Sequence, residues 1–184
     1  MKNHFKSIPI TNAYRLINHG PTVLVTSRLG EKVNVMTAAW QMPVSFRPAL
    51  VAISIDRERF SHKLILEGRE FVINIPSVEM IKEVICCGTQ SGKAIDKFEI
   101  CKLTPIKAHK VNAPLIEECI GNIECKLYSV HEAGDHTIFV GEVVAASVKE
   151  GIFDTYLKVD LNEAKTLHHL GGKVFCHPDG IDLG

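Results

Sequence analysis

The chain has 184 residues, and its 21 basic side chains balance 21 acidic ones, so its formal net charge is zero. A chain of this length suits a single domain, expected over residues 1–184, that buries roughly two thirds of its unfolded surface. The balanced charge excludes a general attraction for nucleic acid, and no lysine-rich run indicates binding to an anionic membrane.

The first half of the chain contains both helical and strand patterns. Apolar spacing over residues 12–18 predicts a short helix that stops at Gly20 and Pro21. A helix-like stretch also covers residues 57–68. Runs rich in β-branched residues predict four strands, the first two forming a hairpin, at residues 23–26, 33–39, 50–55 and 70–75.

The second half continues this mixture. A helix is predicted over residues 77–86, with Ser77 as its N-cap, and a glycine-bearing loop at 87–98 follows it. Two further strands are predicted within residues 121–148, joined through a turn at 132–135. Six strands and four short helices without a regular strand–helix alternation predict a mainly β fold, an antiparallel barrel with a few short flanking helices.

The cysteines and the N-terminal sequence bear on the cellular environment. None of the six cysteines forms a C-x-x-C pair, so we expect no structural metal site. The opening MKNHFKSIPI has no apolar signal core, and no apolar run approaches the roughly 20 residues of a membrane span. These features predict a cytoplasmic protein with reduced thiols. The vicinal pair Cys86 and Cys87 follows an apolar helix, which favours buried, inert thiols over redox-active ones.

Two segments have the composition of an anion site. The loop GTQSGKA at 88–94 lacks the spacing of a nucleotide-binding P-loop, but Ser91, Gly92 and Lys93 can present N–H groups and a cation to an anion. An exposed polar turn is the alternative. The second segment begins a helix and combines the side chains of Arg57, Arg59, Ser61, His62 and Lys63. Its alternative is a solvated charged turn.

Other motifs narrow the chemistry further. No G-x-G-x-x-G follows a strand, and no G-x-S-x-G elbow is present, so neither a Rossmann domain nor a serine hydrolase is expected. His136 lies beside Asp135 at the start of a strand, where the carboxylate can orient the imidazole toward a ligand; simple exposure in a turn is the alternative. His168 and His169 are adjacent on an extended segment and point opposite ways, which disfavours a shared metal.

Several blocks together resemble one family. The runs NVMTAAWQMPVSFRPALVAISI, RERFSHKLI, EFVINIPS, CGTQSGKAIDKF, GDHTIFVGEV and LHHLGGKVF occur in the order found in the flavin reductase-like, FMN-binding split-barrel proteins, which include flavoredoxins and ferric reductases. The resemblance extends from about Ile10 to Phe175. It implies an antiparallel split β-barrel, a homodimer and one FMN per subunit near the subunit interface.

The resemblance also implies the residues of the site. The small side chains of NVMTAAW would let a flavin ring lie close to the backbone, and His136 would lie by the flavin and the nicotinamide as the catalytic residue. The implied cofactor-binding residues are Met36, Thr37, Ala38, Ala39, Trp40, Ser54, Arg57, Ser61, His62, Lys63, Ser91, Gly92 and Lys93. Many relatives have Thr-Tyr where this chain has Ser61-His62.

The function expected from this resemblance is that of an FMN-binding oxidoreductase. NADH or NADPH would reduce the bound flavin, and electrons would pass to a free flavin, a ferric chelate or a protein acceptor. Two alternatives stay open at this point. One is a flavoredoxin-type electron carrier reduced by a protein donor, and the other is a ligand-binding module without a redox role.

Overall fold

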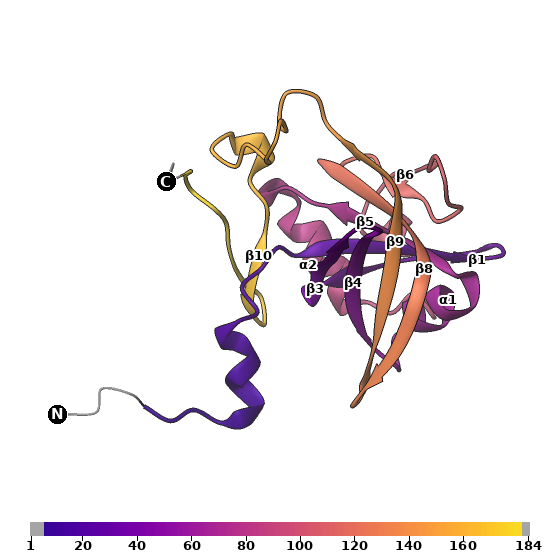
Figure 1. The fold of residues 1–184 in the computed structure, drawn as a ribbon, viewed down its shortest axis with the longest axis horizontal. Coiled ribbons are helices and arrows are strands. Elements are labelled where there is room, and N and C mark those ends of the chain that lie inside the picture. Colours follow the sequence, from indigo (N-terminus) through magenta and orange to yellow (C-terminus); the bar gives the residue numbers. More distant parts are fainter. Residues whose placement is uncertain (1–5, 182–184) are drawn as a thin grey trace.

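The computed structural model describes residues 6–181. Its main feature is a strongly curved antiparallel sheet of seven strands in the order β2-β1-β5-β8-β9-β4-β3 (Figure 1). The strands are β1 Val23–Leu29, β2 Lys32–Ala38, β3 Gln41–Phe46, β4 Ala49–Asp56, β5 Glu70–Ile75, β8 Gly121–Ala133 and β9 His136–Val148. The edge strands β2 and β3 do not pair with each other, so the sheet curves without closing. This confirms the predicted mainly β, antiparallel split-barrel fold.

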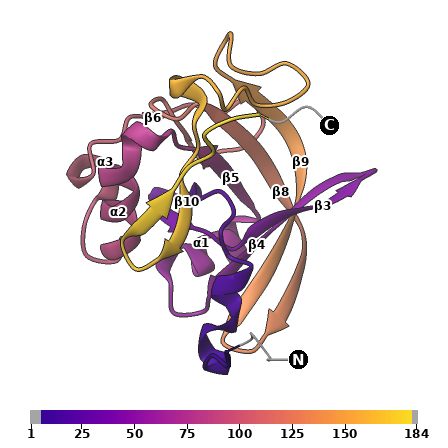
Figure 2. The same ribbon diagram turned by 90° about the vertical axis from the view of Figure 1, so that its left-hand side faces the viewer.

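Helices α2 and α3 lie on the side of the sheet away from the long β8–β9 ribbon (Figure 2), whereas α1 packs against β1 and β2. The helical elements are η1 Ile10–Leu16, α1 Phe60–Gly68, η2 Val78–Met80, α2 Ile81–Thr89, α3 Lys97–Ile100 and η3 Asn162–Ala164. Two small hairpins complete the fold, β6 Pro105–Ile106 with β7 Leu115–Ile116 and β10 His168–Gly171 with β11 Val174–Cys176. Within residues 6–181, no helix is long and apolar enough to cross a membrane.

The predicted strands all form, and the structure adds others that the pattern did not indicate. Strand β3 was not predicted because Pro43 interrupts its sequence and its side chains are mostly exposed. The helix predicted over residues 12–18 is a 3₁₀ helix at Ile10–Leu16, and none of its residues is buried. Its apolar spacing therefore does not mark a face that packs on this chain's core.

The strand sequences contain consecutive apolar residues because the sheet is buried on both faces. Along β1, Val23 and Val25 point into the barrel core with Phe71 and Phe139, whereas Leu24 points into a second core beneath α2. Alternate residues of a strand face opposite sides, so a strand covered on both sides needs apolar residues throughout. The second core places α2 directly over β2.

Gly141 in β9 is required by close packing in the barrel. A Cβ atom there would lie 2.5 Å from Phe71 Cζ and 2.8 Å from Cys125 Cβ, and Phe71 is fully buried. Neither neighbour has room to retreat, because protein cores are close-packed.

We therefore predict that Gly141→Ala lowers the free energy of unfolding by about 1–3 kcal/mol through overpacking. Urea denaturation followed by circular dichroism measures the change. Gly20→Ala is the matched control, since its added Cβ would meet no atom within 4 Å. Equal stability of the two variants would contradict the packing argument.

Candidate functional site

A cavity of about 500 Å³ opens where the end of β2, the β4–α1 junction, the α2–α3 segment and the start of β9 meet. The structure brings ten of the predicted site residues to its wall. They are Met36, Thr37, Ala38, Ala39, Trp40, Ser54, Ser61, Ser91, Gly92 and His136. Segments separated by about a hundred residues in the chain thus form one concave surface.

The small residues of β2 form one wall of the cavity and also receive α2. Thr37 Oγ1 donates a hydrogen bond to the backbone oxygen of Val84 at 2.6 Å. A Cβ atom on Gly88 would lie 3.3 Å from Thr37 Cβ, so the α2 backbone passes close to the strand. A bulky residue at 37 would separate helix and strand, whereas Ala38 and Ala39 keep the adjoining wall flat.

Aromatic side chains form the opposite end of the cavity. The rings of Trp40 and His136 stack with centroids 4.8 Å apart and an interplanar angle of 28°. Tyr14 contacts Trp40 edge-on at 5.6 Å. With the Asn18 amide in the orientation that satisfies both of its polar atoms, its oxygen accepts from Trp40 Nε1 at 3.0 Å. The N-terminal 3₁₀ helix therefore supports the tryptophan that borders the cavity.

The Asp135 carboxylate orients the His136 imidazole, which is one of the two interpretations that the sequence left open. His136 Nδ1 lies 2.6 Å from Asp135 Oδ1, and this hydrogen bond lowers the pKa of Asp135. With Nδ1–H donating to the carboxylate, Nε2 is the nitrogen left to act on a ligand. No protein partner of Nε2 is found within residues 6–181.

The polar end of the cavity lies at the start of α1 and in the α2–α3 segment. Asn34 Nδ2 donates to Ser61 Oγ at 2.8 Å, and a Cβ atom on Gly92 would collide with the Asn34 side chain. Strand, helix and loop are therefore in contact at this point. Arg59 precedes α1 and adds a cation, and no side chain caps the helix.

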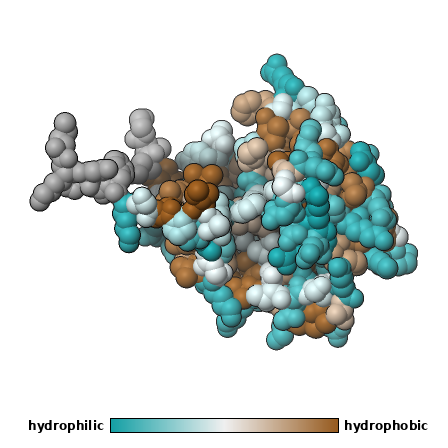
Figure 3. Space-filling view, turned by 90° about the horizontal axis from the view of Figure 1, so that it is seen from below, coloured by the Kyte–Doolittle hydropathy of each residue, from teal (hydrophilic) through white to brown (hydrophobic). Residues whose placement is uncertain are grey.

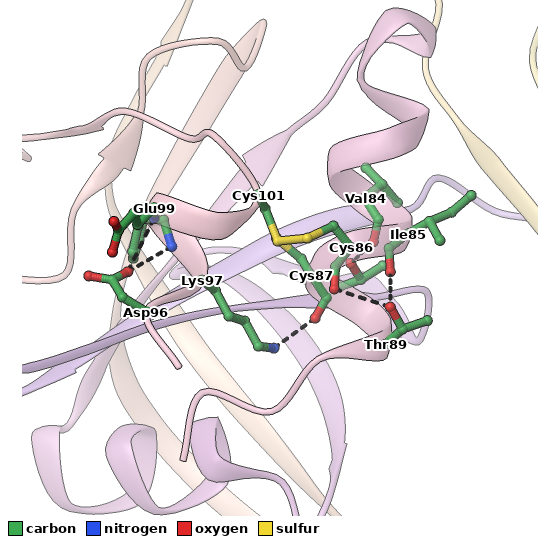
Figure 4. The surroundings of a disulfide bond; sticks show 11 residues. Val84, Ile85, Cys86, Cys87, Thr89, Asp96, Lys97, Glu99 and Cys101 are labelled. Carbon is green, nitrogen blue, oxygen red and sulfur yellow. Dashed lines mark hydrogen bonds between the residues drawn. A yellow bond between two sulfur atoms is a disulfide. The ribbon is translucent and has the colours of Figure 1, made fainter. Parts of the chain in front are cut away.

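Lys97 is a buried cation on the cavity wall that the sequence reasoning missed. Its side chain is 5% exposed, and Nζ donates to the Cys87 backbone oxygen at 2.7 Å (Figure 4). Burial lowers the pKa of Lys97, and burial raises the pKa of the neighbouring Cys87 thiol to about 11. Cys87 is therefore an uncharged thiol at neutral pH, in agreement with the buried, inert thiol that the sequence favoured.

A disulfide joins Cys86 of α2 to Cys101 just after α3 (Figure 4). The expectation of reduced thiols is therefore wrong for these two cysteines. Their separation of 15 residues gave no sign of pairing, but folding brings the Cα atoms to 5.7 Å, within the range for a disulfide. The crosslink closes the segment that carries Gly88, Gly92 and Lys97. Cys87, Cys119, Cys125 and Cys176 are free.

Four predicted cofactor-binding residues lie outside the cavity. Arg57, Lys63 and Lys93 line a neighbouring groove. The His62 imidazole lies 2.9 Å from Thr137 Oγ1 and packs edge-on against the Phe139 ring at 5.0 Å. Burial, with the nearby Arg57, lowers the pKa of His62 and so favours its neutral form. This imidazole belongs to the α1–β9 packing.

Other cavity residues escaped the sequence reasoning. They are Asn34, Ile55, Asp56, Glu58, Phe60, Cys87, Gly88, Gln90 and Lys97. Arg59 also lines the cavity and was named in the sequence as part of an anion site, and Lys97 lies within the resembling run CGTQSGKAIDKF. Their sequence neighbourhoods were therefore recognised, but nothing in the sequence indicates that Lys97 is buried.

Curated proteins and solved structures resemble this chain over most of its length. A protein of undescribed activity from Archaeoglobus fulgidus is 41% identical over 154 residues, covering 84% of this chain and 85% of its own. An NADH-dependent FAD reductase from Streptomyces globisporus is 28% identical over 135 residues, covering 72% of this chain and 73% of its own.

Among solved structures, an FMN-binding protein from Thermus thermophilus with bound 1-cyclohex-2-enone matches with a TM-score of 0.83, 27% identity and full coverage of both chains. A flavoredoxin from Desulfovibrio vulgaris matches with a TM-score of 0.79 and 28% identity, over 89% of this chain and 88% of its own. The family model described as the flavin reductase like domain matches residues 15–168. The chain belongs to the flavin reductase-like family.

Proposed function

We propose that the cavity binds FMN and that the chain is an oxidoreductase working through this flavin. The observation that supports this most is the combination, in one cavity, of a flat small-residue wall, a polar and cationic end, and an aromatic end. Its volume of about 500 Å³ lies within the roughly 300–1,000 Å³ of small-molecule and cofactor sites. The likeness to an FMN-binding protein supports the same cofactor.

The residues present fit such a cofactor. Under this proposal, the ring lies along the wall from Met36 to Trp40, and the phosphate lies at the end formed by Ser61, Ser91 and Gly92. The uncapped start of α1 and the Arg59 guanidinium favour an anion there. The Lys97 ammonium adds a buried positive charge, which favours a negatively charged ligand further because burial weakens screening by water.

Bound FMN would supply the hydride and electron transfer, so the protein needs no nucleophile of its own. The residues of the protein bind the cofactor and orient the electron donor. His136, stacked on Trp40 and held by Asp135, would position a nicotinamide at the aromatic end of the cavity. In this proposal the donor is NADH or NADPH, and the acceptor is a free flavin, a ferric chelate or a protein. The likeness to an NADH-dependent FAD reductase supports nicotinamide as the donor.

A second candidate is a flavoredoxin-type carrier that a protein donor reduces. The likeness to the Desulfovibrio vulgaris flavoredoxin favours it. Both candidates need the same FMN site and differ only in the donor. The third possibility, a ligand-binding module without a redox role, needs neither an FMN site nor an electron donor.

Ala39→Trp should abolish FMN binding, because the indole would occupy the wall on which the ring is proposed to lie. Lys97→Met should raise the Kd for FMN about tenfold or more, through loss of a buried cation. Fluorescence titration of FMN measures both. Ala146→Trp and Lys82→Met, which change exposed residues outside the cavity, are the controls. Unchanged affinity in both site variants would remove the FMN site from this cavity.

Anaerobic stopped-flow mixing of the FMN-loaded protein with NADH or NADPH distinguishes the two redox candidates. We expect loss of the oxidised-flavin absorbance with at least one nucleotide, and slower loss in His136→Ala because the nicotinamide is less well held. Absorbance that persists with both nucleotides would instead indicate a carrier with a protein donor.

We propose that two copies of the chain form a homodimer through η1 and β3. Apolar residues of this region are exposed: Ile10 is 93%, Ile17 83% and Phe46 98% accessible, and Met42 and Val44 are also exposed. Figure 1 shows η1 projecting from the body, and Figure 3 shows hydrophobic surface on this side, beside the N-terminal end of the described chain. Exposed apolar clusters of this kind mark interaction surfaces. Trp40 links this region to the cavity.

The double variant Met42→Glu/Phe46→Glu should therefore be monomeric, because two carboxylates would be buried at the interface. Light scattering coupled to size-exclusion chromatography measures the mass. Tyr128→Glu, at an exposed position of β8, is the control and should leave the dimer intact. A wild-type protein with the mass of one chain would contradict the proposed dimer.

A further inference from the structure

The Cys86–Cys101 disulfide joins the two ends of a segment that forms part of the cavity wall (Figure 4). Cys86 lies in α2, and Cys101 directly follows α3. Between them lie six residues that line the cavity, namely Cys87, Gly88, Gln90, Ser91, Gly92 and Lys97. The crosslink therefore limits how far α3 can move from α2, and with it the wall that this segment forms.

Apart from the disulfide, few contacts hold α3 in place. The helix has only four residues, and a single helical turn is marginally stable by itself. Most side chains of residues 88–96, which lead into it, are exposed. Phe98 packs in the core beneath α2, and Lys97 Nζ donates to the Cys87 oxygen of that helix. A segment with so few buried contacts opens at a low cost in free energy once its crosslink is broken.

The two cysteines of the disulfide differ in exposure. Cys101 is 4% exposed, whereas Cys86 is only partly buried, so a thiolate from solution reaches Cys86 more easily. Two free cysteines, Cys87 and Cys119, belong to the same core. Burial raises the pKa of both of these thiols, that of Cys87 to about 11. Because disulfide exchange requires a thiolate, neither competes for the pair at neutral pH.

The environment expected for the protein also bears on the disulfide. The sequence predicts a cytoplasmic protein, and disulfides in that compartment are usually transient, catalytic or redox-sensing. The Cys86–Cys101 pair lies beside a candidate ligand site and has one partly exposed member. Both features favour a bond that is broken and re-formed over a permanent crosslink.

We propose that the Cys86–Cys101 disulfide is a reversible modification site, reduced by a dithiol, that controls how tightly the cavity holds FMN. The inference rests on the proposed FMN site. One thiolate of the dithiol attacks the Cys86 sulfur, the S–S bond breaks, and Cys101 leaves as a thiolate that takes up a proton. The second thiol then attacks the mixed disulfide, which frees the Cys86 thiol and leaves the reductant as a disulfide. Two electrons and two protons thus pass from the dithiol to the protein.

Reduction acts on the cavity through Lys97. With the crosslink broken, α3 can move away from α2, and the Lys97 ammonium then leaves its buried position at the cavity wall. A site that must be ordered before its ligand binds has a lower affinity than a preorganised one. The oxidised protein therefore holds FMN tightly, and the reduced protein releases it more readily.

Equilibrium titration with FMN tests the proposal on the oxidised protein and on protein that has been reduced with dithiothreitol and desalted under argon. We expect reduction to raise the Kd for FMN about tenfold, through loss of preorganisation, and oxidised glutathione to restore it. Mass spectrometry after alkylation of the folded protein with iodoacetamide should show Cys86 and Cys101 as the residues that become reactive on reduction.

The double variant Cys86→Ser/Cys101→Ser should have the Kd of the reduced protein with or without dithiothreitol, because it cannot form the crosslink. Cys176→Ser removes an exposed free cysteine outside the cavity and is the control, which should respond to dithiothreitol as the wild type does. Hydrogen exchange of the wild-type amides at 87–100 gives a measurement independent of FMN and of the variants. Their protection should fall on reduction.

A disulfide that dithiothreitol does not reduce in the folded protein would overturn the proposal and make the crosslink a permanent one. An equal Kd for FMN in the two states, or unchanged protection of residues 87–100, would also overturn it. Each of these results would leave the proposed function intact. Failure of FMN to bind in either state would instead refute the proposed function, on which the inference rests.

Discussion

The candidate site depends on the close contact of α2 with the end of β2. Thr37 donates to the Val84 backbone, and Gly88 leaves no side chain between helix and strand. Because this contact fixes the helix, it also fixes the segment after it, whose Lys97 then reaches back to the Cys87 oxygen. The Cys86–Cys101 disulfide ties the same segment at its ends. The cavity wall is therefore built from local contacts that support one another.

Charge is distributed unevenly around this wall. The buried ammonium of Lys97 lies at the cavity, whereas Arg57, Lys63 and Lys93 lie on the groove side. A cation that is shielded from water acts more strongly on a nearby charge than an exposed one. The cavity therefore has a buried positive charge, whereas the cations of the groove side are exposed.

The aromatic end of the cavity is connected to the surface proposed for dimerisation. Tyr14 of η1 supports Trp40, and Trp40 stacks on His136. The Trp40 backbone oxygen also accepts from the Ser54 N–H at 2.9 Å, which ties the start of β3 to β4. Under the proposed function, a partner that packs on η1 and β3 would steady the residues that receive the nicotinamide. Assembly and ligand access are then coupled through these side chains.

The sequence alone determined the strands that carry the fold, because β1, β2, β4, β5, β8 and β9 each contain buried apolar side chains whose β-branched pattern is visible in the sequence. Through the resemblance it also indicated ten residues that meet at the cavity, among them Thr37, Trp40 and His136. It did not indicate β3, whose side chains are mostly exposed, or the Cys86–Cys101 disulfide.

Only the tertiary structure decided which cations enter the cavity. The sequence shows a lysine or an arginine but not its depth, since burial depends on what packs over the residue from elsewhere in the chain. Lys97 is buried where α3 contacts β2 and its Nζ reaches the Cys87 oxygen of α2, whereas Lys63 projects from the exposed side of α1. The position of each charge therefore depends on the folded chain. The pattern of apolar residues that drives folding, by contrast, can be read directly from the sequence.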